Sequence, residues 1–227
     1  LYMVTEFIDG QSLLNYIHDN GRIRPGIVAR MVSQILFSLL EAHQRGMLHR
    51  DIKPANVMVH DLPGRPTQIK LLDFGIAKAF DDDADTGDSM SMSLTAKGRV
   101  IGSPGYMSPE QIYGQELGPE SDIYSVGLVA YEMLTAERAI KSMDDLKAAH
   151  EQISGTPIIL PKELKFPAGI VKIVEKMVLK DPKARYSNVE EIIAELEQVA
   201  APQSEGHHRV SLADESSEEL VLEPVLQ

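Results

Sequence analysis

Apolar residues recur along most of the chain at the spacing of amphipathic helices. Pro25 opens the longest such segment, which continues to about Arg45 before Gly46 ends it. Ser12 precedes a shorter helical segment, which Gly21 stops. Further helices are predicted over residues 121–134, 142–153, 170–179 and 187–199. The first of these four is apolar on more than one face, which indicates a buried helix.

Strand signals are few. Residues 1–7 are apolar and extended in character, so they predict a strand. Two short apolar runs, 57–59 and 69–72, flank a polar turn at residues 61–66 and predict a small hairpin. Residues 187–190 form a capping box at the start of the last helix. The pattern therefore predicts a fold that is mainly α with short β hairpins, α+β overall.

Two polar segments interrupt this pattern. Residues 80–100 are rich in Asp, Ser and Thr, and a loop of this length inside a domain is usually functional or disordered. Residues 201–227 lose all aromatic content and read as an acidic, disordered tail. The expected organisation is one catalytic domain over residues 1–200, followed by this tail.

Composition narrows the classes of function. The formal net charge is −12, from 34 acidic and 22 basic residues, which argues against nucleic-acid binding. The sequence has no cysteine, which excludes disulfides and thiolate metal sites. We expect no apolar run to be long enough to cross a membrane. We expect a cytoplasmic protein, although a longer parent protein could be anchored in a membrane.

The most informative segment for chemistry is residues 49–56, His-Arg-Asp-Ile-Lys-Pro-Ala-Asn. Phosphoryl transfer to a hydroxyl needs a carboxylate, a cation and oxygen ligands for Mg²⁺. Asp51, Lys53 and Asn56 offer these three groups in a short stretch. On its own, an Asp and an Asn at this spacing are better explained by a polar loop with local Asx turns.

Further signatures at compatible spacing oppose that simpler interpretation. They are Asp73-Phe74-Gly75, Ser108-Pro109-Glu110, Asp122 and Arg185. This ordered set resembles the eukaryotic-type (Hanks-type) protein Ser/Thr kinases over about residues 1–200. The part of the family fold that the resemblance covers is the C-terminal lobe. The sequence of residues 106–111, Tyr-Met-Ser-Pro-Glu-Gln, favours a bacterial member.

The resemblance implies ATP and Mg²⁺ (or Mn²⁺) as cofactors and a protein with a Ser or Thr acceptor as substrate. Asp51 would be the catalytic base with Lys53 beside it, and Asn56 and Asp73 would hold the metal. The residues implied at the nucleotide are Glu6, Ile8, Ser12, Lys53, Asn56, Met58 and Asp73. Within this set, residues 6–8 correspond to the hinge, next to Thr5 at the gatekeeper position.

Other residues would brace or regulate the site by the same resemblance. Their structural positions are His49, Phe74, Gly75, Ser103, Glu110, Asp122 and Arg185. Glu110 would pair with Arg185, and Asp122 would hold the backbone of the catalytic loop. Arg50 would form a basic pocket for a phosphorylated activation loop, with Ser93 and Thr95 as the favoured sites and self-association as a route to autophosphorylation.

The family's Gly-rich loop and strand lysine are not found in the 227 residues. We therefore expect the N-terminal lobe to be missing except for its last strand, and this polypeptide alone to be inactive. Two alternatives stay open at this point. One is a kinase-like phosphotransferase for small molecules, and the other is a non-catalytic pseudokinase or scaffold.

Overall fold

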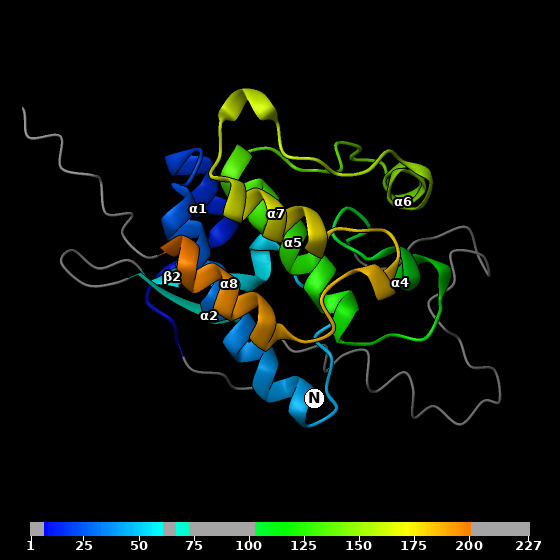
Figure 1. Ribbon diagram of the computed structural model, residues 1–227, viewed down its shortest axis with the longest axis horizontal. Coiled ribbons are helices and arrows are strands. Elements are labelled where there is room, and N and C mark those ends of the chain that lie inside the picture. Colours follow the sequence, from blue (N-terminus) through cyan, green and yellow to red (C-terminus); the bar gives the residue numbers. More distant parts are fainter. Residues whose placement is uncertain (1–6, 61–66, 73–102, 201–227) are drawn as a thin grey trace, which may run out of the picture.

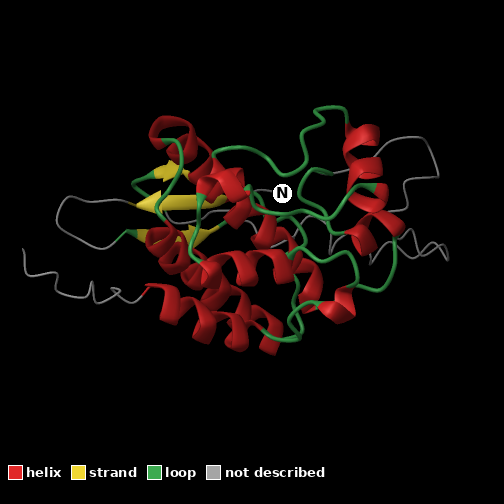
Figure 2. Cartoon of the chain, turned by 45° about the horizontal axis from the view of Figure 1, so that its top comes forward, coloured by secondary structure: helices red, strands yellow, loops and turns green. Residues whose placement is uncertain are grey.

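The computed structural model describes residues 7–60, 67–72 and 103–200, which are coloured in Figure 1. Helices dominate this part of the chain, and a three-stranded sheet lies at one end of the helical body (Figure 2). The predicted fold class is confirmed. The predicted strand at residues 1–7 falls outside the described residues except for Phe7, which lies in no strand and is 90% exposed.

The two N-terminal helices begin where the sequence signals place them. Helix α1 (Leu13–Asn20) follows Ser12, whose Oγ accepts a hydrogen bond from the Asn15 backbone N–H at 3.2 Å. Helix α2 (Pro25–Gln44) starts at its proline, where a missing backbone N–H costs no helical hydrogen bond. Gly46 has φ of 72°, a left-handed conformation that suits glycine after a helix.

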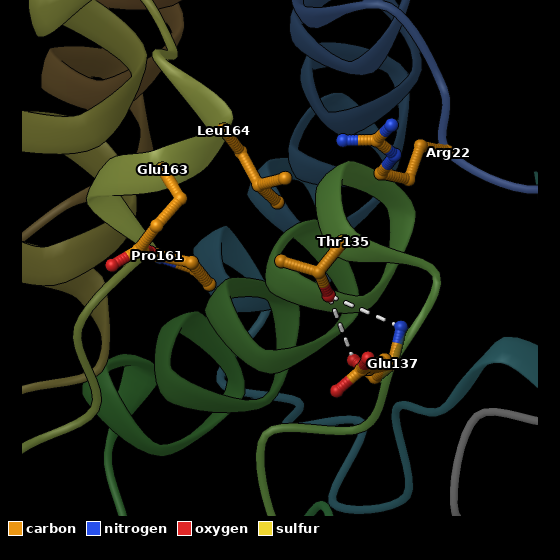
Figure 3. A pocket seen from close by; sticks show the side chains of 6 residues that line it. All are labelled: Arg22, Thr135, Glu137, Pro161, Glu163 and Leu164. Carbon is orange, nitrogen blue, oxygen red and sulfur yellow. Dashed lines mark hydrogen bonds between the residues drawn. The ribbon is translucent and has the colours of Figure 1, made fainter.

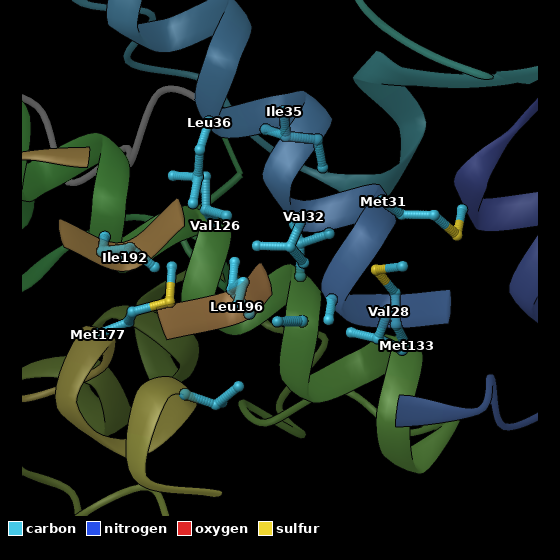
Figure 4. Packing of buried hydrophobic residues seen from close by; sticks show 14 of the residues in the cluster. Val28, Met31, Val32, Ile35, Leu36, Val126, Met133, Met177, Ile192 and Leu196 are labelled. Carbon is cyan, nitrogen blue, oxygen red and sulfur yellow. The ribbon is translucent and has the colours of Figure 1, made fainter. Parts of the chain in front are cut away.

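Helix α2 is the centre of the hydrophobic core. Its buried face includes Val28, Val32 and Leu36, and it packs against α5 (Pro119–Thr135), α8 (Val189–Ala200) and strand β3 (Gln68–Leu71), as Figure 4 shows for the helices. Fourteen of the 17 residues of α5 are buried, so the prediction of a buried helix there is confirmed. Helix α7 (Ala168–Met177) closes the core against α5 and α8.

Helix α2 also corrects one expectation. It has 20 residues and a mean hydropathy of 1.2, enough by length and composition to cross a membrane, so the expectation that no segment would qualify is wrong. The core helix of a globular fold passes the same test, and the apolar residues of α2 form the core here. The hydropathy of α2 is therefore weak evidence for a membrane span.

The sheet has the order β1-β2-β3 and is antiparallel throughout. Strand β2 (Val57–His60) pairs with β3, with Val57 opposite Leu71, so the predicted hairpin is confirmed; its turn at residues 61–66 lies outside the described residues. Strand β1 (Gln11–Ser12) pairs with the other edge of β2 and places Ser12 opposite Met58. The sequence did not predict this two-residue strand.

Two other helices complete the fold, and the four helices predicted after residue 120 each start two or three residues from the predicted position. The short α4 (Pro109–Tyr113) contacts α6 (Asp145–Ser154), and the two lie side by side in Figure 1. Helix α6 begins later than residue 142, because Asp144 caps it by accepting from the Lys147 N–H at 2.9 Å. At α8 the observed cap is Asn188, whose Oδ1 accepts from the Glu191 N–H at 3.0 Å.

Candidate active site

Three predicted residues converge in the loop between α2 and β2. The Lys53 Nζ lies 2.9 Å from Asp51 Oδ2, and the Asn56 Nδ2 donates to the same oxygen at 3.0 Å and to the Asp51 backbone oxygen at 2.9 Å. The Asp51 and Lys53 side chains are 27% and 24% exposed. A carboxylate with a cation beside it thus opens to the surface, which is the geometry that a proton-accepting group needs.

Local backbone structure explains this convergence. Lys53 is extended, with φ of −158° and ψ of 161°, so its side chain can point to the same side as Asp51 two residues earlier. A single 3₁₀ turn (Pro54–Asn56) then folds Asn56 back toward Asp51. Because the Asn56 amide nitrogen makes these contacts, its amide oxygen is not used in them, and such an oxygen is a ligand type that Mg²⁺ accepts.

The second predicted metal ligand cannot be placed. Asp73, Phe74 and Gly75 lie outside the described residues. Leu72, which precedes them, is tied to the same loop: its N–H donates to the Asn56 backbone oxygen at 2.8 Å, and its own oxygen lies 2.8 Å from His49 Nε2. Among the described residues, no group of three or more His, Cys, Asp or Glu side chains could hold a metal ion.

Residues 49–56, here called the catalytic loop, are fastened to α5 through their backbone by Asp122. Its two carboxylate oxygens accept from the backbone N–H groups of His49 and Arg50, each at 2.9 Å, and His43 Nε2 lies 2.8 Å from Oδ2. Arg50 has a positive φ of 65°, which is uncommon for a residue with a side chain. The buried carboxylate therefore holds the loop in a conformation that the backbone alone disfavours.

Glu110 and Arg185 form a buried bidentate pair, 75 residues apart in the sequence. The two contacts are Nη1 to Oε1 at 2.6 Å and Nη2 to Oε2 at 2.9 Å, and the Ser121 hydroxyl also donates to Oε1 at 2.8 Å. Burial by itself raises the pKa of Glu110, but the hydrogen bonds and the charge of Arg185 outweigh it and lower that pKa below its usual value. Glu110 is therefore ionised at neutral pH.

Ser103 joins the segment before α4 to the catalytic loop. Its Oγ accepts from Lys53 Nζ at 3.0 Å, so Lys53 bridges Asp51 and Ser103. A second link was not predicted: the Gln111 Nε2 donates to the Arg50 backbone oxygen at 3.0 Å. Gln111 also closes the capping box of α4 with Ser108, and that local pattern was the signal available in the sequence.

The predicted nucleotide residues are only partly described. Ser12 and Met58 face each other across β1 and β2, while Ile8 lies in the preceding loop and Glu6 falls outside the described residues. A hollow of about 350 Å³ elsewhere on the surface is lined by Arg22, Thr135, Glu137, Pro161, Glu163 and Leu164 (Figure 3). It lies at the other end of α5 from Asp122, about 20 Å along the helix axis at 1.5 Å per residue. This hollow is therefore separate from the catalytic loop.

His43 is the main participant that the sequence did not single out. It sits in the last turn of α2 and contacts Asp122 with its side chain only 8% exposed. A histidine near the end of a core helix is a weak signal, because such residues often interact only with the helix terminus. The contact depends on α5, 79 residues away, which spacing along the chain cannot reveal.

A helical lobe in which a loop anchored to a buried helix presents a partly exposed carboxylate, ammonium and amide cluster is typical of a phosphotransferase of the kinase type. The chain belongs to the protein kinase domain family, whose model matches residues 1–196. It is 36% identical over 203 residues to the serine/threonine-protein kinase pkn3 of Myxococcus xanthus, covering 88% of this chain and 36% of that protein. The predicted membership of the bacterial Hanks-type Ser/Thr kinases is confirmed.

Two other similar bacterial proteins are also serine/threonine-protein kinases by name. PknB of Mycobacterium tuberculosis (strain H37Rv) is 34% identical over 201 residues, 87% of this chain and 30% of that protein. The probable serine/threonine-protein kinase SCO3848 of Streptomyces coelicolor is 35% identical over 199 residues, 86% of this chain and 28% of that protein. The chain thus spans about a third of the length of the curated relatives it matches.

Proposed function

We propose that this chain supplies the catalytic lobe of an enzyme that transfers phosphate from ATP to Ser or Thr hydroxyls of proteins. The observation that carries the proposal is the cluster of Asp51, Lys53 and Asn56, in which the carboxylate and ammonium groups stay partly exposed. The relatives' names, all of them serine/threonine kinases, support the class of acceptor.

In the proposed reaction, the acceptor hydroxyl approaches the exposed face of Asp51. Its oxygen forms a bond to the γ-phosphorus while the bond from that phosphorus to the β–γ bridging oxygen breaks, and ADP leaves with the bonding electron pair. Asp51 accepts the hydroxyl proton. Lys53 Nζ, held between Asp51 and Ser103, is placed to offset negative charge on the transferred group.

The divalent cation would be bound in part by the Asn56 amide oxygen, with Asp73 as the second protein ligand. When bound, Mg²⁺ would supply positive charge that offsets the negative charge of the phosphates. The Asn56 amide fits this role because its nitrogen faces Asp51, so that the oxygen is left for a ligand.

The polypeptide of 227 residues should transfer phosphate poorly by itself. Kinase catalysis depends mostly on positioning and electrostatics, and the Gly-rich loop and strand lysine that position the phosphates in this family are not in its sequence. Incubating the purified 227-residue chain with ATP, Mg²⁺ and a generic protein acceptor tests this statement. Robust phosphorylation by this chain alone would contradict it.

The function itself is tested on the intact gene product with radiolabelled ATP and Mg²⁺, using protein acceptors and small alcohols in parallel. We expect label on Ser and Thr of the protein, and a loss of about 10²- to 10⁴-fold in kcat for Asp51→Asn. Asp19→Asn, at a carboxylate that is 59% exposed on α1, is the matched control and should keep full activity. Label on small alcohols alone, or no transfer by the unmodified protein, would overturn the proposal in favour of a phosphotransferase or a pseudokinase.

We also propose that Ser93 or Thr95 is an autophosphorylation site, with Arg50 as the phosphate-binding cation. Both hydroxyl residues lie outside the described residues, so the support is the position of Arg50 beside Asp51 and the family resemblance. Phosphopeptide mapping of the intact protein after incubation with ATP and Mg²⁺ tests this proposal. An active enzyme with an unmodified loop would refute it.

A further inference from the structure

Residues 103–106, here called the acceptor turn, lie next to the catalytic cluster. The Ser103 hydroxyl contacts Lys53 at 3.0 Å, and the Tyr106 N–H donates to the Ser103 backbone oxygen at 2.9 Å, which closes the turn. Asp51 and Ser103 share the ammonium group of Lys53, so the acceptor turn lies beside the carboxylate that the acceptor hydroxyl is proposed to reach.

Arg138 packs directly on the acceptor turn. It belongs to the connection between α5 and α6, and its guanidinium carbon lies 5.3 Å from the centre of the Tyr106 ring. A β-carbon built on Gly105 would overlap Arg138 Nη2 and would lie 3.1 Å from Cζ. The guanidinium group therefore fills the space that a side chain at Gly105 would take.

Hydrogen bonds explain little of why the Arg138 side chain lies on the acceptor turn. Arg138 Nη1 contacts the Met143 sulfur at 2.9 Å, a weak acceptor on a side chain that is 81% exposed. The Arg138 Nε is buried and finds no hydrogen-bond partner among the residues that the structure describes. Burying such a donor costs free energy, so packing on Gly105 and Tyr106 and attraction to the charge of Glu132 account for the position of the side chain.

The other side of the acceptor turn is held by α5. The Tyr106 hydroxyl donates to Glu132 Oε2 at 2.6 Å, and the Ser125 hydroxyl donates to the Tyr106 backbone oxygen at 2.8 Å. Glu132 is only 5% exposed; burial raises its pKa, and the positive charge of Arg138 partly opposes this effect. The Tyr106 ring is thus fixed between a rigid helix and the guanidinium group of Arg138.

We propose that Arg138 is a positioning residue for the protein acceptor, which it serves by locking the acceptor turn between its guanidinium group and α5. This inference rests on the proposed kinase function. When Arg138 is shortened, the Tyr106 ring loses one of its two supports, and Ser103 loses its fixed place beside Lys53. Binding of the acceptor then weakens, whereas binding of ATP should be little affected, because the proposed nucleotide residues Ser12 and Met58 lie on β1 and β2 and not on the acceptor turn.

Gly105 provides a specific test. It is not among the described glycines with a positive φ, so its backbone does not require glycine. An alanine there meets no conformational restriction, and the Arg138 guanidinium group is what its methyl would strike. Gly105→Ala should therefore be harmful when Arg138 is present and much less harmful when Arg138 is shortened. Such non-additive behaviour is expected only of residues in direct contact.

The experiment measures KM for a protein acceptor, KM for ATP and kcat in the intact gene product. Arg138→Ala should raise the acceptor KM about tenfold or more, because small misplacements near the chemistry are costly. The ATP KM should stay within about twofold, and Arg138→Lys should recover part of the loss because it restores length and charge. The double variant Gly105→Ala/Arg138→Ala should be no worse than Arg138→Ala alone.

Arg30→Ala, on an exposed part of α2, is the matched control and should leave both KM values unchanged. An unchanged acceptor KM in Arg138→Ala, or a double variant whose loss is the product of the two single losses, overturns the inference. If Arg138→Ala does not fold, Arg138→Lys is judged in its place, and an acceptor KM equal to that of the unmodified protein overturns it.

The outcome also separates this inference from the kinase proposal. If the unmodified protein phosphorylates no protein acceptor, the kinase proposal fails. The packing of Arg138 on Gly105 is then judged from the urea midpoints of the unmodified protein, Gly105→Ala, Arg138→Ala and the double variant. Non-additive midpoints support the contact between the two residues, and additive midpoints overturn it.

Discussion

Replacing Glu110 by Gln tests the buried ion pair that joins α4 to the end of the domain. Arg185 has a side chain that is 0% exposed and meets Glu110 through two hydrogen bonds of 2.6 and 2.9 Å. Glutamine keeps the size of the side chain and one acceptor oxygen, but it leaves the arginine charge buried without its counter-charge. The change removes the charge pairing, and its NH₂ group replaces one of the two oxygens that accept hydrogen bonds from Arg185.

The expected loss of stability is large for a single substitution. Removing one partner of a buried pair costs about 3–5 kcal/mol. Arg185 keeps three backbone acceptors, on Leu179 at 2.7 Å, Glu120 at 2.9 Å and Lys180 at 3.0 Å, so the lower end of that range applies. Against a typical total stability of about 5–15 kcal/mol, a loss of about 3 kcal/mol would remove a large fraction.

The loss should depend on pH in a defined direction. Burial raises the pKa of Glu110 and Arg185 lowers it by more, so the folded pKa lies below the ordinary value of 4.5. A carboxyl group with a lowered folded pKa contributes stability that is fully present above the unfolded pKa. That contribution disappears as the pH falls through the folded pKa, so Glu110→Gln should cost less in acid below pH 4.5 than at pH 7.

Urea unfolding at pH 7 and at acid pH measures both effects. With a urea slope of about 2 kcal/mol per molar, a loss of about 3 kcal/mol lowers the midpoint by about 1.5 M at pH 7. Glu137→Gln is the matched control, since Glu137 pairs with Lys141 while both side chains are 64–70% exposed, and it should shift the midpoint little. Equal shifts for the two variants, or a Glu110→Gln shift that does not shrink in acid, would refute the reasoning.

Two further predictions concern α5. Gly127→Ala places a β-carbon 2.7 Å from Val178 Cγ1 and 2.8 Å from Met177 Cβ. Overpacking should cost about 1–3 kcal/mol, which outweighs the gain of about 1 kcal/mol in helix propensity. Urea unfolding should therefore show a net loss of stability of about 1 kcal/mol. Gly26→Ala, where nothing lies within 4 Å, should instead gain about 0.5 kcal/mol, and the same sign for both would contradict the packing argument. Asp122→Asn turns an NH₂ group toward one backbone N–H of the catalytic loop. It should cost about 1–3 kcal/mol and lower kcat, and unchanged values of both would argue against the fastening role.

The elements that the sequence predicted well are those with local causes. Helices α1 and α2 depend on Ser12 and Pro25 at their starts and on glycines after their ends, and all of these lie within or beside the helices themselves. Strand β1 was missed because its two residues are extended only through pairing with β2, 46 or more positions away. The start of α8 was shifted because Ser187 and Asn188 are adjacent candidate caps, and Asn188 is the one that accepts from the Glu191 N–H.

The residues of the site also fall into two groups, those brought together by local spacing and those joined by long-range contacts. Asp51, Lys53 and Asn56 lie within six positions, so their spacing and an extended backbone were enough to bring them together. The pairing of Glu110 with Arg185 spans 75 positions, and family resemblance alone suggested it. The contact of Arg138 with Gly105 had no signal in the sequence, because an arginine in a polar connection is ordinarily solvated.

The long-range contacts have a common origin in one helix. Asp122 in the first turn of α5 fastens the catalytic loop, and Ser121 beside it donates to the Glu110 carboxylate. One turn later Ser125 holds the acceptor turn, and Glu132 holds it again further along the helix. Because interiors are close-packed and α5 is buried nearly all round, these four residues keep fixed distances from one another. Helix α5 therefore sets the position of the loop that carries Asp51, the proposed base, relative to the acceptor turn, which neither surface loop could do alone.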